Sequence, residues 1–198
     1  MDFNTNALGR RVPTELAERK LRPYEGKLAD PAYRTLQRNI RMYRGESKLT
    51  DSLEKAIRRT GLSDGMTISF HHCLRNGDDV INTVVDTIAR MGIKDLRLAQ
   101  TAVFKKHEPL TEHMRSGVIT RIEGSMNGPV GAEASKGTLK APAVLRTHGG
   151  RARAIETGEL KIDVAFLAAS QADEHGNFTG ITGRSAFGPM GFAFADAW

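Results

Sequence analysis

MTISFHHCLRNGDDVINTVVDTIAR, residues 66–90, places a predicted strand, a polar loop and a predicted helix in direct succession. Met66 to Phe70 form the short apolar run that is typical of a buried strand. The apolar residues after the loop recur with helical spacing and are Val80, Ile81, Val84, Val85, Ile88 and Ala89. Gly92 ends this helix. The stretch therefore predicts the first strand and helix of a β-α-β unit.

The same alternation extends on both sides of this stretch. Upstream, Leu49, Leu53 and Ile57 predict an amphipathic helix that follows Thr50 as its cap and ends at Gly61. Further strands are predicted at residues 95–100, 118–122, 143–147 and 162–169, and further helices at 109–116, 132–136 and 151–157. Short strands that alternate with helices predict an α/β fold with a mostly parallel sheet and helices on both faces.

Charge divides the chain into a basic segment, residues 1–48, and an α/β domain, residues 49–198. Residues 10–44 hold ten Lys or Arg and four Asp or Glu, an excess of six that equals the net charge of +6 for all 198 residues. A basic arm of this kind could bind nucleic acid or wrap around a protein surface. Because the arm carries no recognisable nucleic-acid motif, we expect no nucleic-acid binding.

Composition also limits where the protein is expected to work. No run of about 18 apolar residues is present, so we expect no membrane-spanning helix. The N-terminal stretch MDFNTNALGRRVP lacks the apolar core of a secretion signal. The single cysteine, Cys73, excludes an internal disulfide framework. A cytoplasmic location is therefore predicted.

Three polar loops follow predicted strands. They are FHHCLRNGD (residues 70–78), RTHGGRAR (146–153) and ASQADEHGN (169–177). In open parallel sheets, ligands bind beyond the carboxyl ends of the strands, so these loops are the predicted site.

Three kinds of chemistry find little support in these loops. The possible metal ligands are His71, His72, Cys73, His148 and His175. Neighbouring residues of an extended segment point to opposite sides, and no CxxC or HExxH spacing occurs, so no metal site is expected. Cys73 could be a nucleophile activated by the histidines, but a single cysteine after a strand is more often a packed residue. The first loop has one glycine, Gly77, where a dinucleotide fold needs GxGxxG.

Hydrogen-bond donors for an anionic or thioester substrate are the better interpretation. The first loop offers His71, His72, Arg75, Asn76 and Gly77, and the second offers His148, Gly149 and Gly150 backed by Arg151 and Arg153. Those arginines could equally face water. In the third loop, Asp173, Glu174 and His175 could be acid–base groups. Alternatively, Asp173 to Asn177 form a turn with Gly176 at positive φ and Asn177 as its cap, which the residues alone favour.

Longer segments of the chain resemble the citrate lyase alpha chain family, which belongs to the family I CoA-transferases. The segments are EKAIRRTGLSDGMTISFHH (54–72), RNGDDVINTVVDTIARMGIKDLRLA (75–99), EHMRSGVITRI (112–122), THGGRARAIETGELKIDVAFLAA (147–169) and DEHGNFTGITG (173–183). The resemblance implies the CoA-transferase-like N-terminal domain of a citrate CoA-transferase. Such a subunit exchanges acetyl for citryl on an acyl-carrier-protein thioester while citrate is cleaved to oxaloacetate and acetate.

The resemblance also implies partners and a substrate. The partners are the citrate lyase beta (lyase) subunit and the acyl carrier protein, and the ligands are citrate and an acetyl or citryl thioester. CoA or a phosphopantetheine-type thioester is then a substrate, and no cofactor is bound directly. The alternative is a non-catalytic assembly module of the citrate lyase complex.

The resemblance guides the assignment of site residues as well. The class uses a glutamate nucleophile from its second half, which this chain is expected to lack, so no catalytic residue is assigned and the chain alone is expected to be inactive. Glu123 and Glu174 are the nearest local carboxylates. Asn76 stands where relatives carry glycine. The substrate site is assigned to His71, His72, Arg75, Asn76, Gly77, His148, Gly149, Gly150, Glu174, His175, Gly176 and Asn177. His71 and His72 are expected to stabilise oxyanion charge.

Overall fold

The computed structural model describes residues 2–5, 9, 11–14, 47–71, 74–191 and 193–197. The chain divides into two units, Met1–Thr35 and Leu36–Trp198, and each is described by itself. In the first unit, strands β1 (Phe3–Thr5) and β2 (Arg11–Pro13) form an antiparallel hairpin. The Arg11 guanidinium lies 4.4 Å from the centre of the Phe3 ring. Most of the predicted basic arm, the predicted site residue His72, and Cys73 lie outside the described residues.

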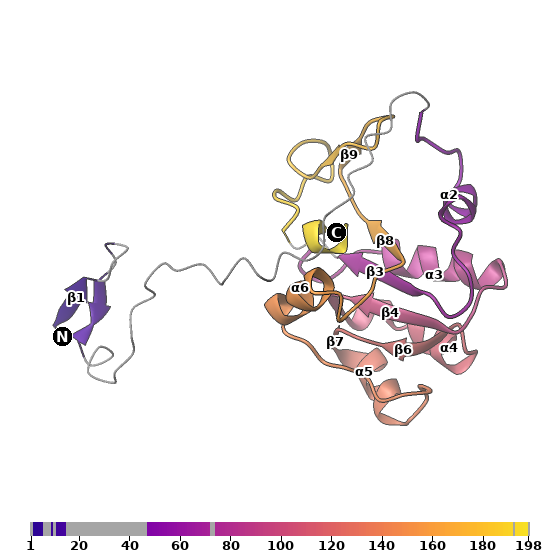
Figure 1. The fold of residues 1–198 in the computed structure, drawn as a ribbon, viewed down its shortest axis with the longest axis horizontal. Coiled ribbons are helices and arrows are strands. Elements are labelled where there is room, and N and C mark those ends of the chain that lie inside the picture. The colour runs from indigo at the N-terminus through magenta and orange to yellow at the C-terminus, as the bar shows by residue number, and fades with distance from the viewer. Residues whose placement is uncertain are drawn as a thin grey trace. The chain divides into compact units, whose positions relative to one another are not determined.

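A four-stranded parallel sheet is the centre of the second unit (Figure 1). Its strands in spatial order are β6 (Ile119–Ile122), β4 (Leu96–Gln100), β3 (Thr67–His71) and β8 (Val164–Leu167). Ile68 of β3 lies opposite Leu98 of β4 on one side and Val164 of β8 on the other. The parallel sheet predicted from the alternation of strands and helices is confirmed.

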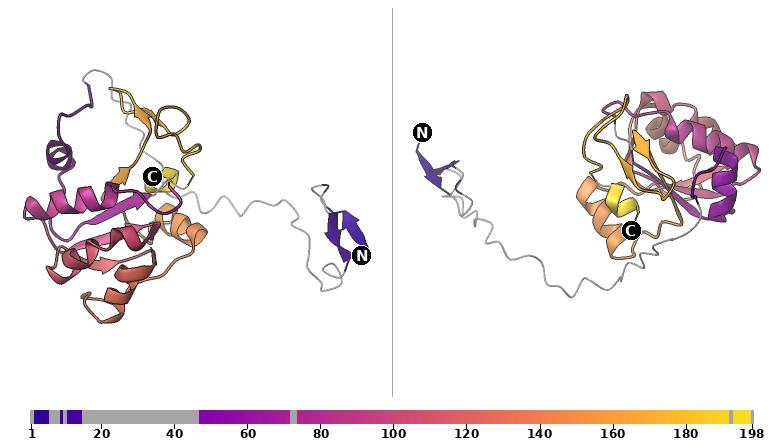
Figure 2. Two further views of the ribbon diagram at one scale, coloured as in Figure 1. Left: turned by 180° about the vertical axis from the view of Figure 1, so that it is seen from behind. Right: turned by 90° about the horizontal axis from the view of Figure 1, so that it is seen from above.

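Helices pack on both faces of this sheet, as predicted. The helices whose apolar residues join the larger core are α2 (Leu53–Thr60), α3 (Val80–Arg90), α4 (Leu110–Arg115) and α5 (Gly128–Ser135). On β4, Leu96 and Leu98 belong to this core, whereas Ala99 belongs to a smaller cluster with α6 (His148–Glu156) and α7 (Ala193–Asp196). Figure 2 shows α6 and α7 on the opposite side of the sheet from α2 and α3.

Short elements complete the unit. They are β5 (Ala102–Val103) paired in parallel with β7 (Ser125–Met126), the 3-10 helix η2 (Lys105–His107), and the antiparallel pair β9 (Gln171–Ala172) and β10 (Phe178–Thr179). Within the described ranges, no helix has the length and apolar character that crossing a bilayer requires.

The strand predicted at residues 143–147 is wrong. Only Val144 pairs, through one isolated parallel bridge to Glu123 at the end of β6. Pro142 removes one backbone donor just before this bridge, and the Leu145 side chain is 71% exposed, so no buried face holds the segment in a longer ladder.

Three helices begin elsewhere than predicted, because local caps decide the first turn. The Ser52 hydroxyl accepts from the Lys55 amide and starts α2, where Thr50 had been expected. Pro129 lies in the first turn of α5, which begins at Gly128, four residues before the expected start. Thr147 caps α6, so this helix already begins at His148.

The buried side chain of Leu98 provides a test of the larger core. Leu98 is 0% exposed, so Leu98→Ala should lower the free energy of unfolding by about 2–5 kcal/mol. The control Leu145→Ala removes the same atoms at a side chain that is 71% exposed and should change it by less than about 0.5 kcal/mol. Urea unfolding followed by circular dichroism measures both values, and equal effects would contradict the assignment of this core.

Glu133 on α5 predicts a dependence of stability on pH. Hydrogen bonds from Arg115, and then from Lys136 and Thr138, lower the pKa of this carboxyl from 4.5 to about 2. A carboxyl with a lowered pKa in the folded state stabilises the fold above its unfolded pKa, and the contribution is lost as the pH falls through the folded value. Glu133→Gln should therefore unfold at a lower urea concentration at neutral pH. The gap to the wild type should close between about pH 4.5 and about pH 2, and a gap that stays constant would refute this account.

Candidate functional site

The first and third polar loops leave the sheet from neighbouring strands. β3 and β8 are adjacent and parallel, and His71 at the end of β3 lies opposite Leu167 at the end of β8. The chain continues from β3 into residues 74–79 and from β8 into the β9–β10 hairpin. The topology therefore brings these two loops to one edge of the sheet, where α/β proteins bind ligands.

His71 is a predicted site residue whose side chain is largely enclosed. Its side chain is 12% exposed, and its Nδ1 atom lies 4.0 Å from Oδ2 of Asp196 on α7. A Cβ atom at Gly191 would lie 3.8 Å from Nε2 of the same ring, so backbone from the segment before α7 lies close to that nitrogen. His71 thus stands between β3 and the C-terminal helix.

Behind His71 lies an ion pair that the sequence analysis did not anticipate. Arg151 and Asp196 have side chains that are 3% and 0% exposed. Arg151 Nη1 donates to Asp196 Oδ2 at 3.1 Å, and Nη2 donates both to Asp196 Oδ1 and to the Ala99 carbonyl, the latter at 2.7 Å. The expectation that Arg151 offers its charge to a ligand or to water is wrong for this residue, whereas Arg153 is exposed.

The glycines of the second loop build the first turn of α6. Thr147 accepts a hydrogen bond from the Gly150 amide through its Oγ1 atom at 3.0 Å. A Cβ atom at Gly150 would approach that hydroxyl to 2.8 Å, whereas one at Gly149 would meet nothing within 4 Å. His148 and Gly149 are exposed. The threonine cap therefore already uses one of the amides that an anion at this helix end would need.

The loop of residues 74–79 rests on His107, which the sequence analysis missed. His107 Nδ1 accepts from the Phe104 amide at 3.0 Å, so Nε2 carries the proton that it donates to the Asp78 carbonyl at 2.9 Å. Burial lowers the pKa of this imidazole, which favours the neutral ring. The pattern of residues in the sequence does not distinguish a buried histidine such as His107 from one on the surface.

Asn76 and Gly77 line a hollow at the same edge. Its volume is about 830 Å³, and the other lining residues are Phe104, Lys105, Lys106, Glu108 and Pro109. Lys106 Nζ lies 3.1 Å from an Asp79 carboxylate oxygen. Arg75 and Asn76 are exposed beside it. The loop therefore presents cationic and amide groups to solvent on a fixed backbone.

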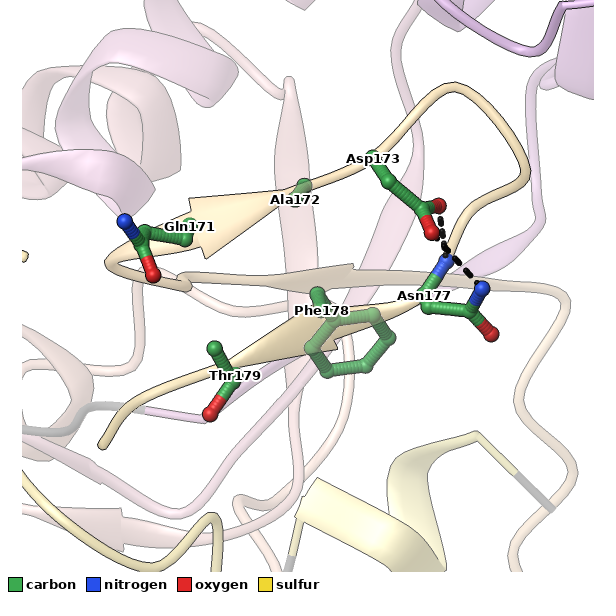
Figure 3. Close-up of a pocket in the computed structure, with 6 residues that line it drawn as sticks. All are labelled: Gln171, Ala172, Asp173, Asn177, Phe178 and Thr179. Atoms are coloured by element: carbon green, nitrogen blue, oxygen red, sulfur yellow. Dashed lines mark hydrogen bonds between the residues drawn. The ribbon is translucent and has the colours of Figure 1, made fainter. Parts of the chain in front are cut away.

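The third loop is a turn, and Asp173 is its centre (Figure 3). One oxygen of Asp173 accepts from the amides of His175 and Asn177, at 2.9 and 2.8 Å, and the other from the Asn177 side chain at 2.8 Å. These bonds, led by the Asn177 side chain, lower the pKa of Asp173. Gly176 has φ of +84°, as the turn interpretation expected, but Asp173 and not Asn177 is the cap.

Neither Glu123 nor Glu174, the two local carboxylates, is placed to act as a nucleophile. Glu123 is 7% exposed, and its Oε1 atom accepts from Arg146 Nε at 2.6 Å, while Arg97 lies 4.0 Å from Oε2. Glu174 is exposed at the tip of the hairpin, 3.8 Å from the His175 ring. In the described part of the chain, no group of three or more histidine, cysteine or acidic residues is arranged to hold a metal ion.

Comparison with known proteins gives consistent matches. The family model for the alpha subunit of citrate lyase (CitF) matches residues 46–198. The citrate lyase alpha chain of Escherichia coli (strain K12) is 50% identical over 153 residues, which cover 77% of this chain and 30% of the relative. The citrate lyase alpha chain of Klebsiella pneumoniae is 46% identical over 178 residues, which cover 89% of this chain and 34% of the relative.

A solved structure matches as well. The crystal structure of the putative alpha subunit of citrate lyase from Streptococcus mutans, in complex with citrate, has a TM-score of 0.79 and 43% identity. The match covers 97% of this chain and 38% of that chain. The chain thus spans about a third of the length of the curated relatives it matches.

Gly77 provides a test of how the loop is held. Its φ is +81°, and an added Cβ atom would lie 2.7 Å from Cε1 of His107. Gly65 has φ of +83° with nothing within 4 Å, so Gly65→Ala measures the backbone strain alone. Gly77→Ala should destabilise the fold by about 1–3 kcal/mol more than this control, because the His107 ring must move. Equal urea unfolding curves for the two variants would show that His107 does not support the loop.

Proposed function

Because the chain belongs to the citrate lyase alpha subunit family, we propose that it forms the N-terminal part of a citrate CoA-transferase subunit. The subunit exchanges acetyl for citryl on the thioester of an acyl carrier protein during cleavage of citrate to oxaloacetate and acetate. The observation that carries the proposal is the family match over the whole α/β unit, including both loops that meet beside His71.

The reaction needs a carboxylate and an oxyanion site. A carboxylate of the subunit that attacks the acetyl thioester displaces the thiolate and forms a mixed anhydride. The thiolate attacks the subunit's own carbonyl in that anhydride, which releases acetate and leaves an enzyme thioester. A citrate carboxylate then displaces the thiolate from the enzyme thioester, and the thiolate attacks the citryl carbonyl of the new anhydride, which gives the citryl thioester and frees the carboxylate of the subunit. Negative charge develops on the thioester oxygen at each attack, so positioned donors lower the barrier. We assign this role to the end of β3, where His71 and the loop that contains Asn76 and Gly77 lie.

The attacking carboxylate is assigned to another part of the subunit. Glu123 is engaged by Arg146, and its buried position gives a substrate little access. Glu174 lies on an exposed turn. Because Glu123 is already bound by Arg146, a second candidate function is also favoured. In it, the chain assembles with other citrate lyase subunits and does not itself turn over substrate.

Citrate and a thioester are the proposed ligands. The Streptococcus mutans protein whose structure matches this chain is described as a complex with citrate. A tricarboxylate suits the hollow beside Asn76 and Gly77, because Lys105 and Lys106 line it and the exposed Arg75 precedes Asn76 in the loop. We extend the proposal to a CoA or phosphopantetheine-type thioester as substrate, with no cofactor bound directly.

Membership of the citrate lyase alpha subunit family implies a multi-subunit citrate lyase complex. Within that complex, we assign the beta (lyase) subunit and the acyl carrier protein as the partners of this chain. A cytoplasmic location follows from the same proposal.

An acyl-exchange assay tests the proposed function. The chain is mixed with acetyl-CoA and citrate, alone and with a separately expressed remainder of an alpha subunit, and citryl-CoA is measured by mass spectrometry. We expect product only in the combined sample, because the attacking carboxylate comes from the remainder. No citryl-CoA in any sample would refute the transferase, and product from the chain alone would refute the assignment of the carboxylate elsewhere.

The same assay tests the histidines. His71→Ala together with His72→Ala should lower turnover by about 10²-fold or more if they stabilise the oxyanion. His113→Ala is the matched control, because this histidine pairs with Asp86 at 2.6 Å on the opposite face of the sheet and should leave turnover unchanged. Unchanged turnover in the double variant would remove these histidines from the mechanism.

A further inference from the structure

The ion pair of Arg151 and Asp196 lies at a position where two apolar side chains could pack equally well. Both side chains are almost fully buried, so both charges have lost their hydration. Such a pair is often no more stabilising than apolar side chains of the same volume. Its neighbours do form an apolar cluster, which consists of Ala99, Ala154, Ile155, Leu160 and Ala195. Packing alone therefore does not explain why charges stand here.

The Asp196 carboxylate has a second neighbour that uses its charge. Its Oδ2 atom accepts from Arg151 and also lies 4.0 Å from His71 Nδ1. This separation is within ion-pair range and longer than a hydrogen bond, and such contacts often shorten when substrate binds. Arg151 in turn is held by the Ala99 carbonyl of β4, the strand beside β3. These contacts therefore connect Ala99 on β4, Arg151 on α6 and Asp196 on α7 to the His71 ring at the end of β3.

We propose that Asp196, fixed by Arg151, is the positioning residue of His71, and that it keeps a proton on Nδ1. The inference rests on the proposed function, in which His71 lies in the thioester site. A carboxylate beside one ring nitrogen sets which nitrogen carries the proton and how the ring is turned. The other nitrogen, Nε2, is then the one that serves the substrate.

The charges around the ring agree with a donor role at Nε2. Asp196 from α7 lies beside the ring, and Arg151 from α6 lies behind Asp196. The Asp196 carboxylate lies on the side of Nδ1, where it is placed to accept a proton from that nitrogen. A ring that carries a proton on each nitrogen donates to Asp196 through Nδ1 and to an anionic oxygen of the substrate through Nε2.

The ring nitrogens of His71 can be observed directly. In the full chain labelled with ¹⁵N at histidine, the Nδ1 signal of His71 should have the shift of a protonated nitrogen. Asp196→Asn should lose that signature. The control Asp163→Asn should keep it, because Asp163 accepts from the Thr67 amide at the opposite end of β3. A wild-type ring without a proton on Nδ1, or an Asp196→Asn ring identical to the wild type, would overturn the proposal.

A second variant separates positioning from structural support. Asp196→Asn leaves Arg151 buried without its partner and could fail to fold. The double variant Arg151→Met/Asp196→Leu removes both charges and should keep the fold. We expect it to unfold like the wild type, to lose the Nδ1 signature, and to lower turnover about 10-fold or more in the combined acyl-exchange assay. Wild-type turnover with an unchanged signature in this variant would show that the ion pair only supports the structure.

The two readouts also separate this proposal from the proposed function. If the wild-type sample produces no citryl-CoA, the transferase proposal fails, whatever the ring signals are. If the wild type is active and the double variant is equally active, the positioning role of Asp196 fails and the transferase proposal stands.

Discussion

The buried ion pair between Arg151 and Asp196 is the constraint on which the site end of the molecule depends. Its atoms connect α6, α7 and the Ala99 carbonyl of β4. Two charges without water must meet each other and nearby acceptors in good geometry, because each unmatched group costs free energy. This requirement fixes α7 against the sheet more narrowly than apolar packing would. It brings Asp196 to within 4.0 Å of the last residue of β3.

The two faces of the sheet are consequently held in different ways. The face covered by α2 to α5 has a large apolar core, in which Leu98 and Ile88 are 0% exposed. The face covered by α6 and α7 has a small cluster around Ala99 and Leu160. Apolar burial is roughly additive and undirected, whereas ion pairs and hydrogen bonds are directional. The larger core can therefore supply most of the stability, while the polar face sets the geometry beside His71.

What could be predicted from the sequence depends on the distance along the chain between interacting residues. The turn at Asp173 was foreseeable, because its bonds to Asn177 span four residues. The parallel sheet was foreseeable from the periodicity of single strands and helices. The burial of Arg151 was not, because its partner lies 45 residues away and an arginine near a helix start usually faces water. The strand expected at residues 143–147 does not form, although the segment is apolar. Apolar residues form a strand ladder only where other residues bury them, and the sequence of the segment does not show whether they do.

The positions of the carboxylates and of the hydrogen-bond donors bear on how the proposed transferase site is divided between this chain and the rest of the subunit. Of the two carboxylates considered as local nucleophiles, Glu123 is engaged by Arg146 and Glu174 lies on an exposed turn. Donors are what the edge does supply, with His71 at the end of β3 and the loop at Gly77 fixed by His107. A carboxylate nucleophile and its oxyanion donors must approach one carbonyl from different sides. The proposed division, with a rigid donor side on this chain and a nucleophile on another part of the subunit, satisfies that geometry.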